Sequence, residues 1–220
     1  MRVLILGGTR YFGKNTYERL MKNAHLTCVK TLSRSKQNRD TNSHIICDRK
    51  NRNELFSVFN SFQPDVIVDM VNFSIDDSNG LIEAYSKNLL TSLKHYIMVS
   101  SFFVYNHFDL REYREKQLDF SLIKMKKIDN YTYQKIEAES ALYKSKLMNL
   151  TSILRLPFIF SSDDYSGRFQ LMCEISKRGN IKSNSGNYRY SMISKSLASK
   201  GIEYLCNTSP QGIIDFANSG

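Results

Sequence analysis

A tyrosine and a lysine one helical turn apart are the side chains best suited to chemistry in this sequence. They are Tyr131 and Lys135, at the start of a predicted helix, and a spacing of four places both on one helix face. A neighbouring ammonium favours the ionised phenol, and lowering a tyrosine pKa from about 10 to near 7 requires roughly 4 kcal/mol. Tyr131 would then exchange a proton with a substrate oxygen, whereas Tyr133 faces elsewhere. The same spacing also occurs on ordinary helix surfaces.

Two serines form the second element of this candidate site. Ser100 and Ser101 follow the apolar run at 96–99, which predicts a buried strand. Active sites of open α/β sheets lie at the carboxyl ends of strands. A serine there, 30 residues before the tyrosine, can reach the same substrate oxygen, although strand-end capping is the simpler interpretation.

A glycine-rich segment lies between the first apolar run and the first helical pattern. In a Rossmann fold this is the position at which the backbone approaches a pyrophosphate and the helix N-terminus offers free N–H groups. A plain strand-to-helix turn is the alternative, and the location directly after an N-terminal strand favours binding. The predicted dinucleotide contacts are Gly7, Gly8, Thr9, Arg10, Tyr11, Phe12 and Gly13.

The end of the second predicted strand bears on which dinucleotide binds. Chains that bind NAD usually carry Asp or Glu there, but this chain has Ser33 and Arg34. An arginine suits a 2′-phosphate, so these residues, with help from Arg10, favour NADP, and NAD is the alternative. A solvated arginine is the other interpretation. Asp48 could bind the adenine amino group or serve as a charge near a helix N-terminus.

Short apolar runs alternate with helical patterns along the chain. Strands are predicted at 3–6, 26–32, 44–47, 66–71, 96–99 and from 152, and helices at 11–22, 55–62, 81–93 and 131–148. This alternation predicts an α/β fold with a Rossmann-like, doubly wound parallel sheet. Residues 1–160 are expected to form the dinucleotide-binding domain. Residues 161–220 are expected to form a small, incomplete substrate lobe whose chain returns to the main sheet near its end.

Composition narrows the class of protein. A 220-residue chain with 41% hydrophobic residues is ordinary for a globular protein, and its net charge of +10 favours an anionic partner. Four widely separated cysteines predict free buried thiols, with neither a metal site nor a disulfide framework. No run approaches the roughly 18 apolar residues of a membrane span, and the N-terminal run is too short for a signal peptide. We therefore expect a soluble, cytoplasmic protein with no membrane partner.

The order of these motifs resembles an extended or atypical short-chain dehydrogenase/reductase of the NAD-dependent epimerase/dehydratase family. Residues 7–13 are similar to the Gly-Gly-Thr-Arg-Phe-x-Gly turn of atypical members, and residues 99–105 resemble the catalytic serine segment. The resemblance covers essentially the whole chain. Arg10 departs from it by replacing the middle glycine of the usual fingerprint. The chain also stops before the helices that usually complete the substrate lobe, as expected of a short form or a truncated chain.

The resemblance implies a role for each matched residue. Tyr131 is the acid and base and also contacts the cofactor, Lys135 lowers its pKa and holds the cofactor ribose, and Ser101 hydrogen-bonds the reacting oxygen. Ser100 is implied to lie toward the cofactor, and Arg168 to border the substrate.

The implied activity is hydride exchange between NAD(P) and a nucleotide-linked sugar, ending in epimerisation, dehydration or reduction. A homodimer is compatible with this resemblance. A protein of the same fold that binds RNA or a nucleotide without catalysis is the alternative, since some atypical relatives resemble RNA-binding proteins. The positive charge is scattered and forms no basic stripe interleaved with aromatic residues, which argues against a nucleic-acid partner. The basic stretch at 124–127 is interpreted as a solvated loop rather than a diphosphate site.

Overall fold

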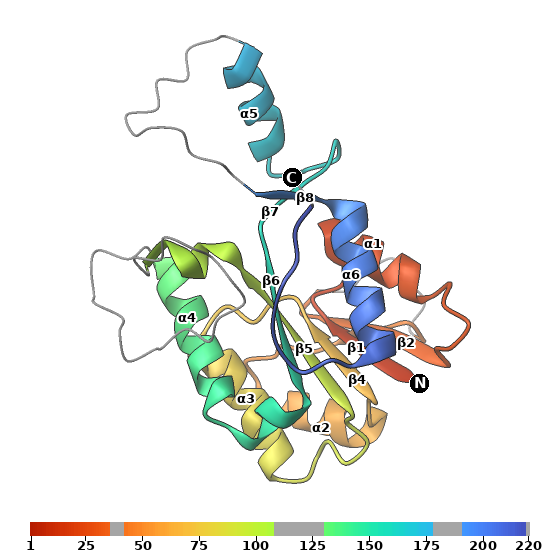
Figure 1. Cartoon of the computed structure of the whole chain (residues 1–220). Helices are drawn as coiled ribbons and strands as arrows, with labels where there is room; N and C mark the ends of the chain where they lie inside the picture. Colours follow the sequence, from red (N-terminus) through yellow and green to blue (C-terminus); the bar gives the residue numbers. More distant parts are fainter. Residues whose placement is uncertain (36–41, 108–129, 178–190, 219–220) are drawn as a thin grey trace.

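Seven parallel strands form the central sheet of the computed structural model, which describes residues 1–35, 42–107, 130–177 and 191–218 (Figure 1). The strands are β1 (Arg2–Leu6), β2 (Cys28–Ser33), β3 (His44–Ile46), β4 (Val66–Asp69), β5 (His95–Ser101), β6 (Thr151–Leu156) and β9 (Gly212–Asp215). Their order across the sheet is β3-β2-β1-β4-β5-β6-β9. The predicted α/β class with a Rossmann-like, doubly wound parallel sheet is confirmed.

Helices cover both faces of this sheet (Figure 1). On one face lie α1 (Tyr11–Leu20) and α6 (Lys195–Thr208), and on the other lie α2 (Arg52–Phe62), α3 (Ile75–Ser86) and α4 (Asn130–Tyr143). Side chains alternate between the faces along β1, so that Val3 and Ile5 join the core under α1 and α6, while Leu4 and Leu6 join the other. Burial on both faces explains why the strands are continuous apolar runs.

A smaller unit lies beyond the carboxyl edge of the sheet (Figure 1). It consists of β7 (Phe158–Phe160), β8 (Met192–Ser194) and α5 (Arg168–Lys177), and the two strands pair in parallel. No side chain of α5 is buried among the described residues. Two short 3₁₀ helices complete the described elements, η1 (Phe102–His107) after β5 and η3 (Lys146–Leu150) before β6.

Several predicted element boundaries were wrong. The helix expected at 81–93 is α3, which begins at Ile75 because Ser74 caps it by accepting a hydrogen bond from the Asp77 N–H. The strand expected at 66–71 ends at Asp69, and the helix expected at 131–148 ends at Tyr143 and is followed by η3. In each case apolar spacing alone misplaced the end, which local caps and turns determine.

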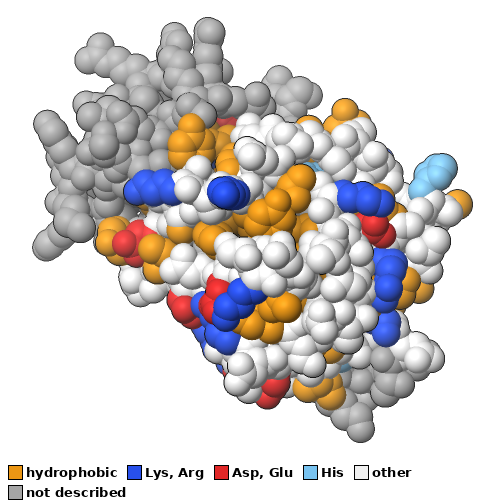
Figure 2. Space-filling model, turned by 90° about the horizontal axis from the view of Figure 1, so that it is seen from below, with side chains coloured by type: hydrophobic (Ala, Val, Ile, Leu, Met, Phe, Trp, Pro, Cys, Tyr) orange, Lys and Arg blue, Asp and Glu red, His pale blue; other side chains and the backbone are white. Residues whose placement is uncertain are grey.

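All four cysteines are free thiols, but only Cys47 and Cys206 are buried; Cys28 and Cys173 are partly exposed, contrary to the expectation of buried thiols. The described residues bring together no three His, Cys, Asp or Glu side chains that could hold a metal ion. Within the same ranges, no helix has the length and apolar character needed to cross a membrane. On the face shown in Figure 2, Lys and Arg side chains are dispersed among apolar and uncharged ones.

A buried histidine makes stability depend on pH. His95, at the start of β5, has no exposed surface, and its Nε2 lies 2.7 Å from Ser152 Oγ on β6. Burial lowers its pKa from 6.5 to about 4. As the pH falls below 6.5, His95 is protonated in the unfolded chain but stays neutral in the folded chain. The folded state therefore loses stability until the pH reaches about 4, where His95 is protonated in both states.

We expect the free energy of unfolding to fall by up to about 3 kcal/mol between pH 6.5 and 4, beyond any change due to carboxylates. Urea unfolding at several pH values measures this fall. A His95→Gln variant should lack this component, so an unchanged pH slope in that variant would contradict the assignment.

Candidate active site

The predicted site residues other than Arg168 lie at or just after the carboxyl ends of β1, β2, β3 and β5 and at the starts of α1 and α4 (Figure 1). Because all strands are parallel, these ends meet at one edge of the sheet. The glycine turn follows β1 at this edge, and the Gly7 N–H donates to the Leu32 carbonyl at the end of β2 over 2.9 Å. The sheet therefore places the glycine turn, predicted to bind the pyrophosphate, next to the end of β2, predicted to bind the adenosine.

The glycine turn is packed too tightly to accept side chains. Gly7 has a φ of +86°, and a Cβ there would lie 2.4 Å from Val71 Cγ1 in the loop after β4. A Cβ on Gly13 would lie 2.9 Å from Met70 Sδ and 3.1 Å from the Gly7 carbonyl oxygen. Side chains of the loop after β4 therefore pack directly against the turn, and the positive φ of Gly7 and the close backbone contact at Gly13 both favour glycine.

The start of α1 is open to an anion. Arg10 is its N-cap and is exposed, no acidic residue occupies the first turn, and among the described residues no side chain caps the helix. The first N–H groups and the positive end of the helix dipole therefore face the turn. This is the electrostatic arrangement that suits a pyrophosphate.

Tyr11 has a side chain directed away from this turn. Its φ is +46°, and its hydroxyl donates to the Ile159 carbonyl of β7 over 2.9 Å. Burial and the nearby Asp164 and Asp163 raise the pKa of this phenol to about 12. The tyrosine therefore stays neutral and links the glycine turn to the smaller unit, and only its backbone is available for a phosphate.

The ends of β2 and β3 lie side by side, since Ser33 pairs with Ile46. Arg34 is exposed at the first of these ends, and the Ser33 hydroxyl donates to the Ser35 carbonyl over 3.2 Å. Asp48, partly exposed, follows β3 and accepts the Lys50 N–H at 3.0 Å. A cation and a carboxylate are thus available at the end of the sheet where the sequence predicts the adenosine.

Lys135 is buried at the carboxyl ends of β4 and β5. Its Nζ donates to the carbonyl oxygens of Asn72 at 2.6 Å and Val99 at 2.8 Å, and only 2% of the residue is exposed. Burial lowers its pKa from 10.5 to about 8, against the opposing effect of Asp69 and Glu139. Within the described residues, two of its three N–H donors have acceptors in the protein, and the third is available to a ligand.

Tyr131 lies one turn before this lysine and is 43% exposed. Its ring centroid is 6.4 Å from that of Phe73, and Lys135 Nζ lies over the same Phe73 ring at 5.0 Å. The two predicted catalytic side chains of α4 are therefore joined through one aromatic ring. Tyr133, the other tyrosine of this turn, donates its hydroxyl to Glu137 Oε1 over 2.7 Å.

The two serines of β5 have different partners. Ser101, at the end of the strand, accepts the Phe103 N–H at 3.3 Å. The Ser100 hydroxyl donates to Glu139 Oε1 on α4 over 2.5 Å. The Ser100 hydroxyl donates its hydrogen bond to this buried carboxylate, so we do not propose it as a cofactor contact. Its predicted position toward the cofactor stays a prediction.

Arg168 lies in the smaller unit. It is exposed at the first residue of α5, its Nε donates to Ser166 Oγ at 2.9 Å, and its guanidinium lies over the Phe158 ring at 5.5 Å. Its charge is near Tyr11 at the glycine turn, where it opposes the rise in the pKa of that phenol. The basic stretch at 124–127 falls outside the described residues.

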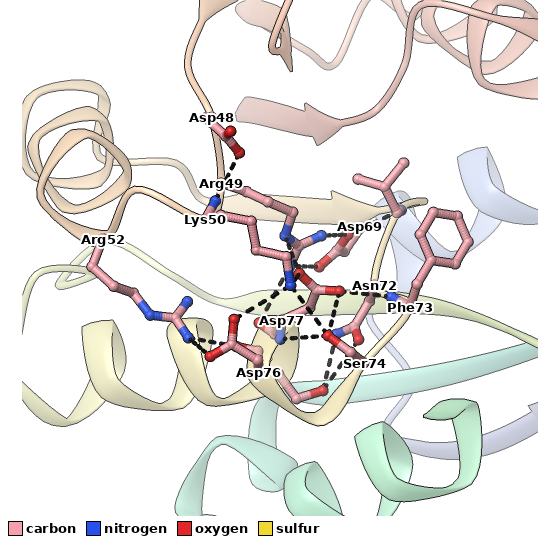
Figure 3. Close-up of polar contacts among 12 residues, drawn as sticks. Asp48, Arg49, Lys50, Arg52, Asp69, Asn72, Phe73, Ser74, Asp76 and Asp77 are labelled. Carbon is pink, nitrogen blue, oxygen red and sulfur yellow. Dashed lines mark hydrogen bonds and ion pairs between the residues drawn. The ribbon is translucent and has the colours of Figure 1, made fainter. Parts of the chain in front are cut away.

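A buried charge cluster beside the loop after β4 was missed by the sequence analysis (Figure 3). Arg49 donates to both carboxylate oxygens of Asp69, at 2.7 and 2.9 Å, and its Nε lies 3.1 Å from Asp77 Oδ1. Asp69 is fully buried within a strand that is otherwise apolar. That lone acid in a buried strand is the signal that could have revealed the cluster, because a buried charge requires a partner.

A second buried ion pair joins α4 to β6. Arg155 and Glu139 have no exposed surface, and Arg155 Nη2 lies 2.5 Å from Glu139 Oε2. Arg155 also donates to the Tyr105 hydroxyl at 2.7 Å, and that hydroxyl donates to Asp215 Oδ2 at 2.6 Å. This network fixes the helix that carries Tyr131 and Lys135 against the sheet.

The strand order of this parallel sheet, and the glycine turn that connects β1 to the uncapped start of α1, are typical of Rossmann-like proteins that bind dinucleotides. The sequence profile of the NAD dependent epimerase/dehydratase family matches residues 3–168. The chain therefore belongs to the NAD-dependent epimerase/dehydratase family, as the sequence analysis expected.

Several solved structures have a similar fold. A dTDP-glucose 4,6-dehydratase from Bacillus anthracis in complex with NAD is 14% identical, with a TM-score of 0.73, and the match covers 100% of this chain and 76% of that one. WbmG of Bordetella bronchiseptica, in complex with NAD and UDP, is 17% identical, with a TM-score of 0.71 and coverages of 99% and 72%. A UDP-N-acetylglucosamine 4-epimerase from Bacillus cereus is 15% identical, with a TM-score of 0.68 and coverages of 100% and 78%. No curated protein matches the chain in sequence.

Proposed function

We propose that this chain binds a nicotinamide dinucleotide along the carboxyl edge of its sheet and exchanges a hydride with a nucleotide-linked sugar. The observation that carries the proposal is the buried Lys135 ammonium, held by the Asn72 and Val99 carbonyls one helical turn from Tyr131. A buried lysine with a free donor at this edge is suited to stabilise a phenolate and to bind a ribose hydroxyl.

The residues present fit such a cofactor. Gly7 and Gly13 keep the turn compact against the loop after β4, and the uncapped start of α1 offers donors to a pyrophosphate. The third Lys135 donor, which has no acceptor among the described residues, suits the ribose next to the nicotinamide. When bound, the nicotinamide supplies a hydride acceptor, and in its reduced form a donor.

The protein's part of the reaction is a proton transfer. In the oxidative direction the substrate carbon gives up a hydride, while the Tyr131 phenolate takes the proton of the attached hydroxyl and a carbonyl forms. Lys135 stabilises the phenolate by its charge, and Ser101 at the end of β5 hydrogen-bonds the reacting oxygen. In the reductive direction Tyr131 returns its proton to that oxygen.

The substrate class is supported by relatives. The Bordetella bronchiseptica structure is described in complex with NAD and UDP, and two other similar structures are enzymes of nucleotide-linked sugars. We assign the smaller unit, which consists of β7, α5 and β8, to the substrate lobe. Arg168 at the start of α5 is then available to an anionic substrate group.

The end of β2 is proposed to select NADP. Arg34→Ala is expected to weaken NADPH binding by about 10–100-fold, because it removes charge-assisted hydrogen bonds to the 2′-phosphate, and to leave NADH binding unchanged. Fluorescence titration with both reduced dinucleotides measures the two dissociation constants. Equal loss for both would show that Arg34 does not read the 2′-phosphate.

The proposal as a whole is tested by what the purified protein binds. Mass spectrometry of the ligands released on denaturation, together with titration by NAD, NADH, NADP and NADPH, should identify a nicotinamide dinucleotide. Binding of labelled RNA that weakens with salt, without binding of any dinucleotide, would instead favour the RNA-binding alternative.

A further inference from the structure

The lysine that the proposed function depends on is held partly by a loop rather than by a strand. Val99, which accepts one Lys135 N–H, belongs to β5, so the sheet fixes its carbonyl. Asn72, which accepts the other, comes three residues after the end of β4. The direction of the Asn72 carbonyl therefore depends on the contacts that hold this loop.

Those contacts come from the Asn72 side chain, which is fully buried. Its Nδ2 donates to Ser78 Oγ and to the Tyr96 hydroxyl, each at 3.0 Å. Ser78 belongs to α3, and its hydroxyl reaches the Ala138 carbonyl of α4 at 3.0 Å. The loop is thus fastened to α3, α4 and β5 through one amide group.

Tyr96 connects this amide to the charge cluster shown in Figure 3. Its hydroxyl accepts from Asn72 and donates to Asp69 Oδ2 at 3.0 Å, and Arg49 holds the same carboxylate with two hydrogen bonds. Burial raises the pKa of Tyr96 well above 10, so the phenol keeps its proton and its direction of donation. Arg49 directly follows Asp48, which the sequence analysis considers as a partner of the adenine amino group.

We propose that Tyr96 is a positioning residue that orients Asn72 so that its backbone carbonyl receives the Lys135 ammonium, in a hydrogen-bonded chain that begins at Arg49 after β3. The chain spans the site from the adenosine end to the predicted catalytic lysine. Its consequence for turnover rests on the proposed function, but its effect on Lys135 does not.

The charged groups around Lys135 set the direction of the expected change. Asp69 at the end of β4, Glu139 on α4 and Asp77 on α3 favour the ammonium, and Arg49 and burial oppose it. If the Asn72 carbonyl moves away, the ammonium loses an acceptor while these charges stay. The pKa of Lys135 should therefore fall below its value of about 8.

The test is a Tyr96→Phe variant, which removes one hydroxyl and keeps the ring. Protein with ¹³C-labelled lysine is titrated by NMR without cofactor, and the Lys135 Cε signal is assigned by its loss in Lys135→Arg. We expect the midpoint of Lys135 to fall by about one pKa unit, about the value of one hydrogen bond to a charged group. Tyr105→Phe is the matched control, because it removes a buried hydroxyl from the other charge network.

An unchanged midpoint in folded Tyr96→Phe, or an equal fall in Tyr105→Phe, would overturn the proposal. Should Tyr96→Phe fail to fold, Ser78→Ala removes the second support of the Asn72 amide and is expected to lower the midpoint in the same direction. An unchanged midpoint in that variant would also overturn it. Because the titration uses the protein without ligand, absence of dinucleotide binding would refute the proposed function and leave this result standing.

Discussion

Tyr131→Phe is expected to lower kcat by about 10²–10⁴-fold, the usual contribution of a general acid or base. The side chain is 43% exposed and its ring packs beside Phe73, so removing the hydroxyl leaves the packing of α4 intact. The dissociation constant of the dinucleotide should therefore change by no more than about twofold. Steady-state kinetics with a nucleotide-linked sugar, beside a dinucleotide titration, measure both quantities.

Tyr133→Phe is the matched control for this prediction. Tyr133 lies on the same helical turn, but its hydroxyl is bonded to Glu137 on the helix surface. Its kcat should stay near that of the unmodified protein. A similar loss in both variants, or full activity in Tyr131→Phe, would show that the phenol at position 131 does not transfer the proton.

Arg155→Met is expected to lower the free energy of unfolding by about 3–5 kcal/mol, the usual cost of breaking a buried ion pair from one side. Among the described residues, Glu139 would be left with the Ser100 hydroxyl as its hydrogen-bond donor, at a position with no exposed surface. Whole domains are stable by only about 5–15 kcal/mol, so much of the stability would be lost. Urea unfolding monitored by circular dichroism gives the free energy.

The double variant Arg155→Met/Glu139→Leu separates charge from packing. Removing both charges leaves no uncompensated carboxylate, and replacement of buried pairs by apolar residues is often neutral. The double variant should therefore be more stable than Arg155→Met alone. If the free energy of unfolding of Arg155→Met lies within about 1 kcal/mol of that of the unmodified protein, the ion pair contributes as little as a surface salt bridge.

The fold was predictable because its main signals are local. Continuous apolar runs followed by glycine or serine indicated strands buried on both faces, and their alternation with helical patterns indicated a parallel sheet. The helix at 195–208 carries the same kind of signal, since Ala198, Ile202 and Leu205 follow a helical spacing, but it was not among the predicted elements. Its packing against α1, where Thr16 donates to Ser199, is a tertiary contact that this pattern does not specify.

The arrangement around Lys135 was less predictable. The spacing from Tyr131 follows from the helix repeat, so the pair could be named from the sequence. Its environment depends on Arg49 meeting Asp69 and on Tyr96 meeting Asn72, contacts between separate strands and loops. Only the order of strands in the sheet brings these residues together, and no local pattern encodes that order.

The strand order also has a consequence for how the chain folds. β1 lies in the middle of the sheet, so that Val3 pairs both with Val29 and with the distant Val66. Each of these parallel pairings requires a crossover connection between the two strands. The chain loses the conformational entropy of that connection before the strands gain their hydrogen bonds. Such long-range parallel pairing makes the search for the native topology slow, and until β4 arrives one edge of the most apolar strand has no neighbour in the sheet.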